Sequence, residues 1–232
     1  MDYSYNSLYK SEIIYDQSLR KFMLQVYNYM TIALAISGLV SLGISMSPNA
    51  MSFIWGTPFK WVAIFAPLAM SFLFMMSIDK VSANIAKIFL IVFASAMGLS
   101  LSSIFAVFTM GSIVQVFFIS SATFGAASLY GYTTKADLTK FGSFLIMGAI
   151  GLIIAGVVNL FFQSSIMAFA ISCIAVIIFT GLTAFDTQQI KGYHDTTNGE
   201  EREKAGIFGA LQLYLDFINI FVNLLQLIGD RK

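Results

Sequence analysis

The sequence predicts an all-α membrane protein in which seven helices cross the bilayer and the last one lies inside the bundle. Hydrophobic residues make up 58% of the 232, and charged residues only 11%, against about 25% in soluble domains. The last apolar stretch also carries a continuous polar face. Seven stretches approach the ~20 mostly apolar residues that a span requires: 23–46, 60–78, 86–109, 112–131, 141–161, 166–188 and 206–228.

The polar face of stretch 206–228 distinguishes it from the other six. Its members recur at intervals of four, three, four and three, which places them within about 80° of one helix face: Gln212, Asp216, Asn219, Asn223 and Gln226. The rest of the circumference is mostly Leu, Ile, Phe, Val and Tyr. Because an acid facing lipid is costly, we expect this face to point toward other helices or water.

The spans form one membrane domain, 22–232, preceded by a polar segment, 1–21. This segment lacks the charged-then-apolar order of a cleavable signal peptide, so the first span is the expected targeting signal. With the N-terminus in the cytoplasm, ten Lys and Arg residues lie inside and three outside, as the positive-inside rule requires. We favour seven full spans over a re-entrant last segment because 23 residues are long enough to cross.

The connections carry little that predicts a soluble function. Segment 191–205 is the longest polar stretch between spans and is expected to be a loop, with His194 solvated beside Asp195 rather than bound to a metal. The net charge of +1 and the lack of a basic stripe argue against a nucleic-acid partner. The lone cysteine, Cys173, excludes an internal disulfide.

Small residues at four-residue spacing predict close helix packing in lipid. One set comprises Ala94, Gly98 and Ser102, and another comprises Gly151 and Ala155. We expect both sets to be packing surfaces.

Two acids fall within predicted spans or at their edge, Asp186 and Asp216, and such groups cost about 2.5–3.5 kcal/mol each to insert. Asp186 lies five residues before Lys191, about 7 Å from that interface. Asp216 lies ten residues after Gly206, about 15 Å from the same side. Contact between them therefore requires the sixth span to dip or the seventh to start higher.

If the two carboxyls meet, they share a proton, because two adjacent carboxylates repel each other. Ionised together, they would need a cation between them, and hard divalent cations prefer such oxygens. Thr183 lies one turn from Asp186 on nearly the same face. The pair is then a pH-responsive gate or cation site. The alternative is that each acid bonds neighbouring Thr, Asn or Tyr groups and fixes helix packing.

Enzymatic chemistry is not expected. Intramembrane aspartyl proteases carry Gly-x-Gly-Asp at one acid, whereas Asp216 follows Leu213, Tyr214 and Leu215. The last span has no lysine for a retinal Schiff base. No Ser/His/Asp set, phosphate loop or metal-spaced cluster is present, so no cofactor is expected.

Two segments resemble the signatures of the Bax inhibitor-1 (transmembrane Bax inhibitor motif) family: GLTAFDTQQIK and LYLDFINIFVNLLQLIG. The central stretch, SLSSIFAVFTMGSIVQVFFISSATFGAASLYGYTTKADLTKFGSFLIMGAIGLIIAGVVNLF, is similar to bacterial members. The resemblance covers about residues 20–230 and implies a seven-helix fold with the last helix central. It also implies a bacterial inner-membrane location and a pH-sensitive calcium leak gated by an aspartate pair.

Carried over residue by residue, the gate and tentative Ca²⁺ site are Asp186 and Asp216. The pore-lining candidates share the polar faces around these acids: Thr183, Gln212, Asn219, Asn223 and Gln226. Some members close the gate with an arginine at the end of the second helix, where this chain reads FMMSIDKVS. Lys80 is the candidate latch there, as a flexible point charge. SSIF at 102–105 lacks the proline of some relatives, so a straighter third helix is expected.

Two other functions remain open. Relatives associated with a membrane-bound AAA protease or with stress and cell-death control imply a regulatory interaction protein. That role would use the first 20 residues and segment 191–205. A proton-coupled transporter is the third hypothesis. The expected partners are membrane lipids, protons and Ca²⁺ as the permeant ion.

Overall fold

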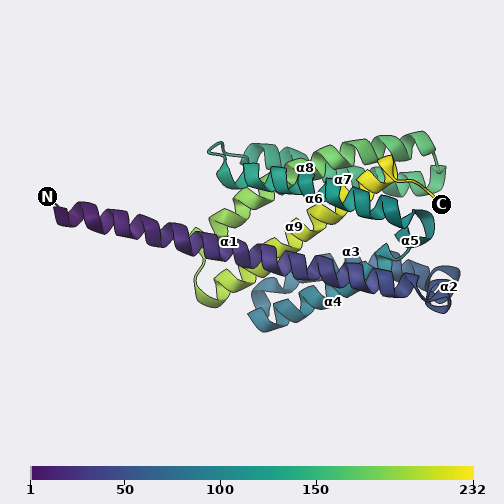
Figure 1. Ribbon diagram of the computed structural model, residues 1–232, viewed down its shortest axis with the longest axis horizontal. Coiled ribbons are helices and arrows are strands. Elements are labelled where there is room, and N and C mark those ends of the chain that lie inside the picture. Colours follow the sequence, from purple (N-terminus) through teal and green to yellow (C-terminus); the bar gives the residue numbers. More distant parts are fainter. Residues whose placement is uncertain (1) are drawn as a thin grey trace.

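Helices make up the architecture of the computed structural model, which describes the backbone of residues 2–232 and the side chains of 15–78 and 80–232 (Figure 1). No strand is assigned in this part of the chain. The elements in order are α1 (Asp2–Ser45), α2 (Pro48–Gly56), α3 (Phe59–Ser77), the 3-10 turn η1 (Ile78–Lys80), α4 (Ala83–Leu101), α5 (Ile104–Val107), α6 (Met110–Thr133), α7 (Thr139–Phe162), α8 (Ser165–Thr196) and α9 (Gly199–Ile228).

Seven helical segments of the described chain are long and apolar enough to cross a membrane, and each overlaps one predicted span. They begin and end as follows: Tyr15–Ser45, Phe59–Ser77, Ala83–Val107, Met110–Thr133, Thr139–Phe162, Ser165–Thr196 and Gly199–Ile228. The all-α, seven-helix prediction is therefore confirmed.

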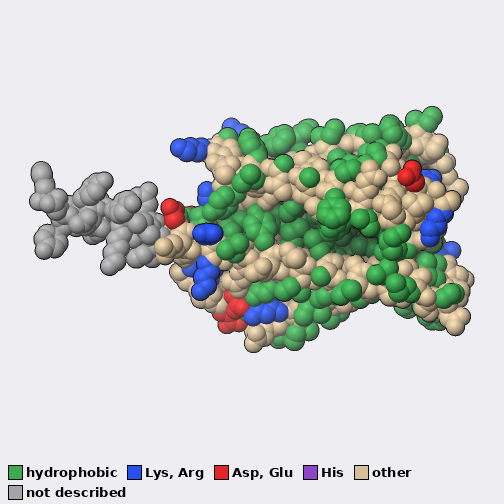
Figure 2. Space-filling model, viewed as in Figure 1, with side chains coloured by type: hydrophobic (Ala, Val, Ile, Leu, Met, Phe, Trp, Pro, Cys, Tyr) green, Lys and Arg blue, Asp and Glu red, His purple; other side chains and the backbone are tan. Residues whose placement is uncertain are grey.

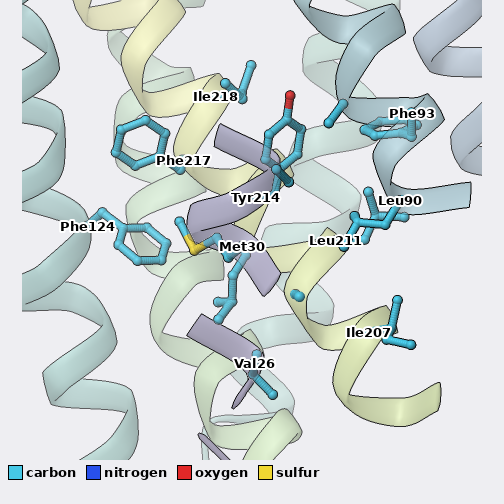
Figure 3. Packing of buried hydrophobic residues seen from close by; sticks show 14 of the residues in the cluster. Val26, Met30, Leu90, Phe93, Phe124, Ile207, Leu211, Tyr214, Phe217 and Ile218 are labelled. Carbon is cyan, nitrogen blue, oxygen red and sulfur yellow. The ribbon is translucent and has the colours of Figure 1, made fainter. Parts of the chain in front are cut away.

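The last helix is the core of the bundle, as predicted. It packs against α8, α1, α6 and α4. Figure 3 shows its buried side chains between residues of α1, α4 and α6. Ile207, Leu213, Tyr214 and Ile220 are almost fully inaccessible. α9 also crosses the whole bundle. The tail that follows it is tied to the α5–α6 junction, where the Thr109 amide donates to the Asp230 carbonyl at 3.0 Å.

The two ends of the bundle can be named from this course. The N-terminal end holds the α3–α4, α6–α7 and α8–α9 turns, and the C-terminal end holds the end of α1 and the tail after α9 (Figure 1). Lys and Arg side chains lie at both ends and flank a hydrophobic belt (Figure 2). Which end faces the cytoplasm stays a prediction.

The expected loop 191–205 is helical, and that prediction is wrong. α8 continues to Thr196 and α9 begins at Gly199. Arg202 closes the corner by donating to the carbonyl oxygens of His194 at 2.9 Å and Thr197 at 3.0 Å. Hydropathy marks where a helix leaves the apolar layer, whereas hydrogen bonds and caps decide where it ends.

The third span is interrupted rather than straight, although it lacks the proline. α4 ends at Leu101 and α5 begins at Ile104. Ser102 and Ser103 donate their hydroxyls to the carbonyl oxygens of Leu99 and Ser100. Trp55 also donates to the Ser102 hydroxyl at 3.0 Å. Serine hydroxyls offer the backbone an alternative to the helical ladder, which explains the break.

Candidate functional site

Asp186 of α8 and Asp216 of α9 come together inside the bundle. Their side chains lie within hydrogen-bonding reach of each other. Only 8% of Asp186 and 4% of Asp216 is exposed. The sequence placed the two acids on consecutive antiparallel helices, and the structure brings their carboxyl groups into one site.

The depth difference between the acids is removed by the oblique course of α9 across the bundle (Figure 1). Gly209 packs against Ile190. From that contact to the acids, α8 advances four residues and α9 seven, which is about 6 Å and 10 Å of helix. A tilted helix needs more residues to cover the same depth, so the longer path ends level with Asp186.

Two glycines that sequence reasoning missed hold α8 in place beside Asp186. Gly131 of α6 lies against the backbone carbonyl of Ala184, and Gly142 of α7 lies against the ring of Phe185. Neither position has room for a Cβ atom. The available signal was the small residue itself, but no spacing pattern separated these glycines from the others.

The predicted small-residue sets fare differently. A Cβ added at Gly98 would lie 2.6 Å from the Ser37 carbonyl oxygen, so this residue of the first set packs tightly against α1. A Cβ added at Gly151 would meet nothing within 4 Å, and this glycine is exposed. The expectation that Gly151 is a packing surface is wrong within the described chain, since α7 turns this face outward.

A chain of hydroxyl groups runs beside the acidic pair. Tyr27 bonds Ser128 at 2.6 Å, and Ser128 bonds Thr187 at 3.0 Å. Thr187 in turn donates to the Thr183 carbonyl oxygen at 2.7 Å. Thr183 is fully buried and donates its own hydroxyl to Phe179. These hydroxyls are therefore satisfied by helix carbonyls and by each other.

The pair itself is less well satisfied. The Asp216 Oδ2 atom is buried and has no hydrogen-bond partner among the described residues. The Gln212 Oε1 atom, one turn away, is in the same condition. Buried acceptors without donors are rare in proteins, so this part of the polar face has the capacity to hold a proton or a cation.

Beyond Asp216, the polar face of α9 leads to the C-terminal end of the bundle. Asn219 and Asn223 donate their amide groups to carbonyls of their own helix at 2.8 Å. Asn219 and Gln226 line a cavity of about 490 Å³, and Gln226 also lines a second cavity of about 400 Å³. Arg231 lines both cavities. The face is packed near the acids and hollow near its end.

Lys80, the candidate latch, ends η1 with an exposed side chain. The described side chains show no contact between it and Asp186. Its role as a latch stays a prediction.

His194 is buried, with 4% exposed, so the expectation of a solvated histidine is wrong. Its Nε2 atom lies 2.8 Å from the Ser18 hydroxyl and its Nδ1 atom 3.2 Å from Asp195. It is buried because α8 continues as a helix and α1 packs over it. In the described chain, no three His, Cys, Asp or Glu residues gather as a metal site.

Comparison with known proteins places the chain in a family. Residues 19–232 match the family model described as inhibitor of apoptosis-promoting Bax1. An uncharacterized protein of Rickettsia prowazekii is 44% identical over 94% of this chain and 93% of its own length. The inner membrane protein YbhL of Escherichia coli K12 is 40% identical over 92% of this chain and 93% of its own length. The chain therefore belongs to the Bax inhibitor-1 family of multi-pass membrane proteins.

Proposed function

We propose that this protein is a pH-sensitive leak for Ca²⁺, gated by Asp186 and Asp216. The observation that carries the proposal is the pair itself: two carboxyl groups lie side by side in the membrane interior, nearly inaccessible to water. Charged groups inside a membrane are expensive and most often mark ion or proton paths.

The pair supports two states. With one proton, the carboxyls form a hydrogen bond that joins α8 to α9. With none, two negative charges repel in a low-dielectric interior. A hard divalent cation between them relieves that repulsion. The proton and the cation therefore compete for the same oxygens, which couples conduction to pH.

The ligand set favours passage over storage. Ca²⁺ takes roughly six to eight oxygen ligands, and among the described acids the site offers only the carboxyls of Asp186 and Asp216. Conduction requires a site that binds weakly enough to release the ion. The free Gln212 oxygen and the cavities at Asn219 and Gln226 supply polar groups on either side of the pair.

The hydrogen bond between the two carboxyls predicts the sign of the pH dependence of Ca²⁺ flux. Flux should rise as the pH is raised, because loss of the shared proton breaks the link between α8 and α9. A latch through Lys80 predicts the reverse, since protonation of Asp186 would release the lysine. We expect the first behaviour because Lys80 is exposed and the described side chains show no contact to Asp186.

Calcium flux into liposomes that contain a trapped Ca²⁺ dye tests the proposal. Wild-type protein and Asp216→Asn are compared over a pH series, with Asp137→Asn as the matched control, since Asp137 is an exposed acid between two spans. We expect pH-dependent flux in the wild type and the control, and none of that dependence in Asp216→Asn. Flux through Asp216→Asn that equals the wild-type flux at every pH would refute the gate assignment.

The proposal places the N-terminus in the cytoplasm, with no enzymatic activity and no cofactor. The argument for this orientation is charge. Basic residues gather at the N-terminal end of the bundle: Arg20, Lys21, Lys80, Lys87, Lys135, Lys140, Lys191, Arg202 and Lys204. Lys60, Arg231 and Lys232 lie at the other end. A bias of this kind orients inner-membrane proteins.

One observation favours a second candidate function, the regulatory interaction protein. α1 begins at Asp2 and projects beyond the other helices (Figure 1). Such a projection offers a partner, for example a membrane-bound protease, a surface outside the bilayer. Deleting 2–14 should abolish partner binding and leave Ca²⁺ flux intact if the two functions are separate.

A further inference from the structure

An apolar cavity of about 370 Å³ lies between α1 and α6, in the half of the bundle nearer its C-terminal end. Both helices pack against α9 but scarcely against each other. Figure 2 shows hydrophobic side chains along the depression between them. Leu34 of α1, Phe117 and Phe118 of α6, and Phe217 and Phe221 of α9 line the cavity. It is separate from the acidic pair and its polar face.

The surroundings restrict what can occupy this cavity. It lies within the membrane-crossing parts of α1, α6 and α9. Phe118, on its edge, is 67% exposed, so the cavity borders the lipid. Water is excluded from the hydrocarbon layer and has no partners on an aromatic wall. The fitting occupant is an apolar chain that enters sideways from the bilayer.

One polar group in the wall is unexplained. Ser41 is 2% exposed, lines the cavity and has a buried hydroxyl without a partner among the described residues. Ser37, one turn earlier, differs because its hydroxyl donates to Ala33 and bonds Tyr214. Ser41 lies four residues before the end of α1, about 6 Å along the helix. At that depth the ester carbonyls of lipids lie close to the apolar layer.

A cation lies beside one residue of the cavity wall. The Lys232 ammonium donates to the carbonyl oxygen of Phe105 at 2.7 Å, and Phe105 lines the same cavity. The side of the cavity nearer the membrane surface thus has a positive charge, followed inward by a hydroxyl donor and then by aromatic walls. A glycerophospholipid has the matching order of phosphate, ester carbonyl and acyl chain.

We propose that this cavity is a binding site for one acyl chain of a glycerophospholipid. The chain lies against Phe117 and Phe217, the Ser41 hydroxyl donates to its ester carbonyl, and the phosphate lies near Lys232. The bound lipid fills the space between α1 and α6, which the protein itself leaves open. This site is independent of the proposed gate.

Photo-crosslinking tests the site. The full chain is placed in vesicles of phosphatidylethanolamine and phosphatidylglycerol, with a trace of phosphatidylglycerol that carries a diazirine at the end of one acyl chain. We expect labelled peptides from 34–42 of α1 and 217–221 of α9, in addition to bulk-lipid labelling of α7. Absence of label on α9 would overturn the proposal.

Two glycines of α1 provide matched variants. A Cβ at either Gly38 or Gly43 would meet nothing within 4 Å, and both are exposed, but only Gly38 lines the cavity. Gly38→Leu should fill the cavity and reduce labelling of α9 at least fivefold, whereas Gly43→Leu should leave it unchanged. Equal labelling in the two variants would contradict a defined site.

The hydroxyl is tested separately, which keeps the proposal falsifiable if Gly38→Leu folds poorly. Ser41→Ala should reduce labelling of α9 at least twofold. Ser45→Ala, whose hydroxyl bonds Leu42 on the same helix, should not change it. Wild-type labelling in Ser41→Ala would overturn the assigned hydrogen bond. A protein–protein crosslink at 34–42 in place of the lipid adduct would identify a second copy as the occupant and overturn the lipid site.

Discussion

α7 and α9 both cross the membrane, yet they lie in opposite environments. The share of residues buried in the most apolar part of the span is 6% in α7 and 67% in α9. α7 packs mainly against α8, whereas α9 packs extensively against α1, α4, α6 and α8. The more polar helix is the central one. Apolarity alone therefore identifies a span, and the distribution of polar residues around the helix indicates whether it faces lipid or protein.

The difference follows from the solvent. Lipid tails are as apolar as Leu, so hydrophobicity does not draw helices together in a bilayer. α9 is held by close approach and polar contacts, such as Gly209 against Ile190 and Tyr214 against Ser37. α7 needs few of these contacts because most of its surface is already suited to lipid.

The largest expected effect on stability comes from adding one methyl group to α9, and the same change in α7 is the comparison. Gly209→Ala should lower the free energy of unfolding by about 1–3 kcal/mol, because its Cβ would press on the fully buried Ile190. Gly151→Ala in α7 should leave it unchanged or raise it by up to about 1 kcal/mol, since alanine favours helix and the site is open. Thermal unfolding in detergent, followed with a thiol-reactive dye at Cys173, measures both. Equal changes in the free energy of unfolding for the two variants would contradict the contrast between a buried α9 and a lipid-facing α7.

A smaller effect is expected from removing one hydroxyl. Tyr214→Phe should cost about 0.5–1.5 kcal/mol, because the buried bond to Ser37 is lost while Ser37 keeps its bond to Ala33. The matched change on α7 is Ser143→Ala, which removes an exposed hydroxyl and should leave stability unaltered. The same unfolding assay compares the two. A Tyr214→Phe variant that is as stable as the wild type would show that packing alone positions α9.

The smallest effect concerns the start of α7. The Thr139 hydroxyl and amide donate to Asp137 at 2.6 and 2.9 Å and hold the pKa of that carboxyl below its usual range. A lowered pKa contributes stability above the unfolded value of about 3.9, and that contribution is lost as the pH falls through the folded pKa. Thr139→Ala should raise the pKa of Asp137 toward its ordinary value, as a carboxyl NMR titration would show. An unmoved titration would exclude the hydroxyl as the cause.

The sequence predicted the parts of the structure that depend on local pattern. Apolar length located all seven spans, and the interval of polar residues in α9 indicated its buried position. The acidic pair could also be predicted from the sequence, since Asp186 and Asp216 enter from the same side of consecutive helices.

Features that depend on tertiary contacts were not predictable in this way. The oblique course of α9 arises from helix packing, and the closeness of Gly131 to Ala184 depends on where two distant helices cross. The burial of His194 requires both the continuation of α8 and the cover of α1. The break at Ser102 depends on hydroxyl bonds and on Trp55, which lies far away in sequence.

The central claim is that Asp186 and Asp216 act as one unit, and a double-mutant cycle on pH-dependent Ca²⁺ flux tests it most directly. Flux in liposomes is measured across the pH range for Asp186→Asn, Asp216→Asn and the double variant. If the carboxyls share one proton, either single change removes the pH dependence and the double variant behaves like the singles. Two single variants that each retain a pH-dependent flux, with effects that add in the double variant, would contradict the shared gate.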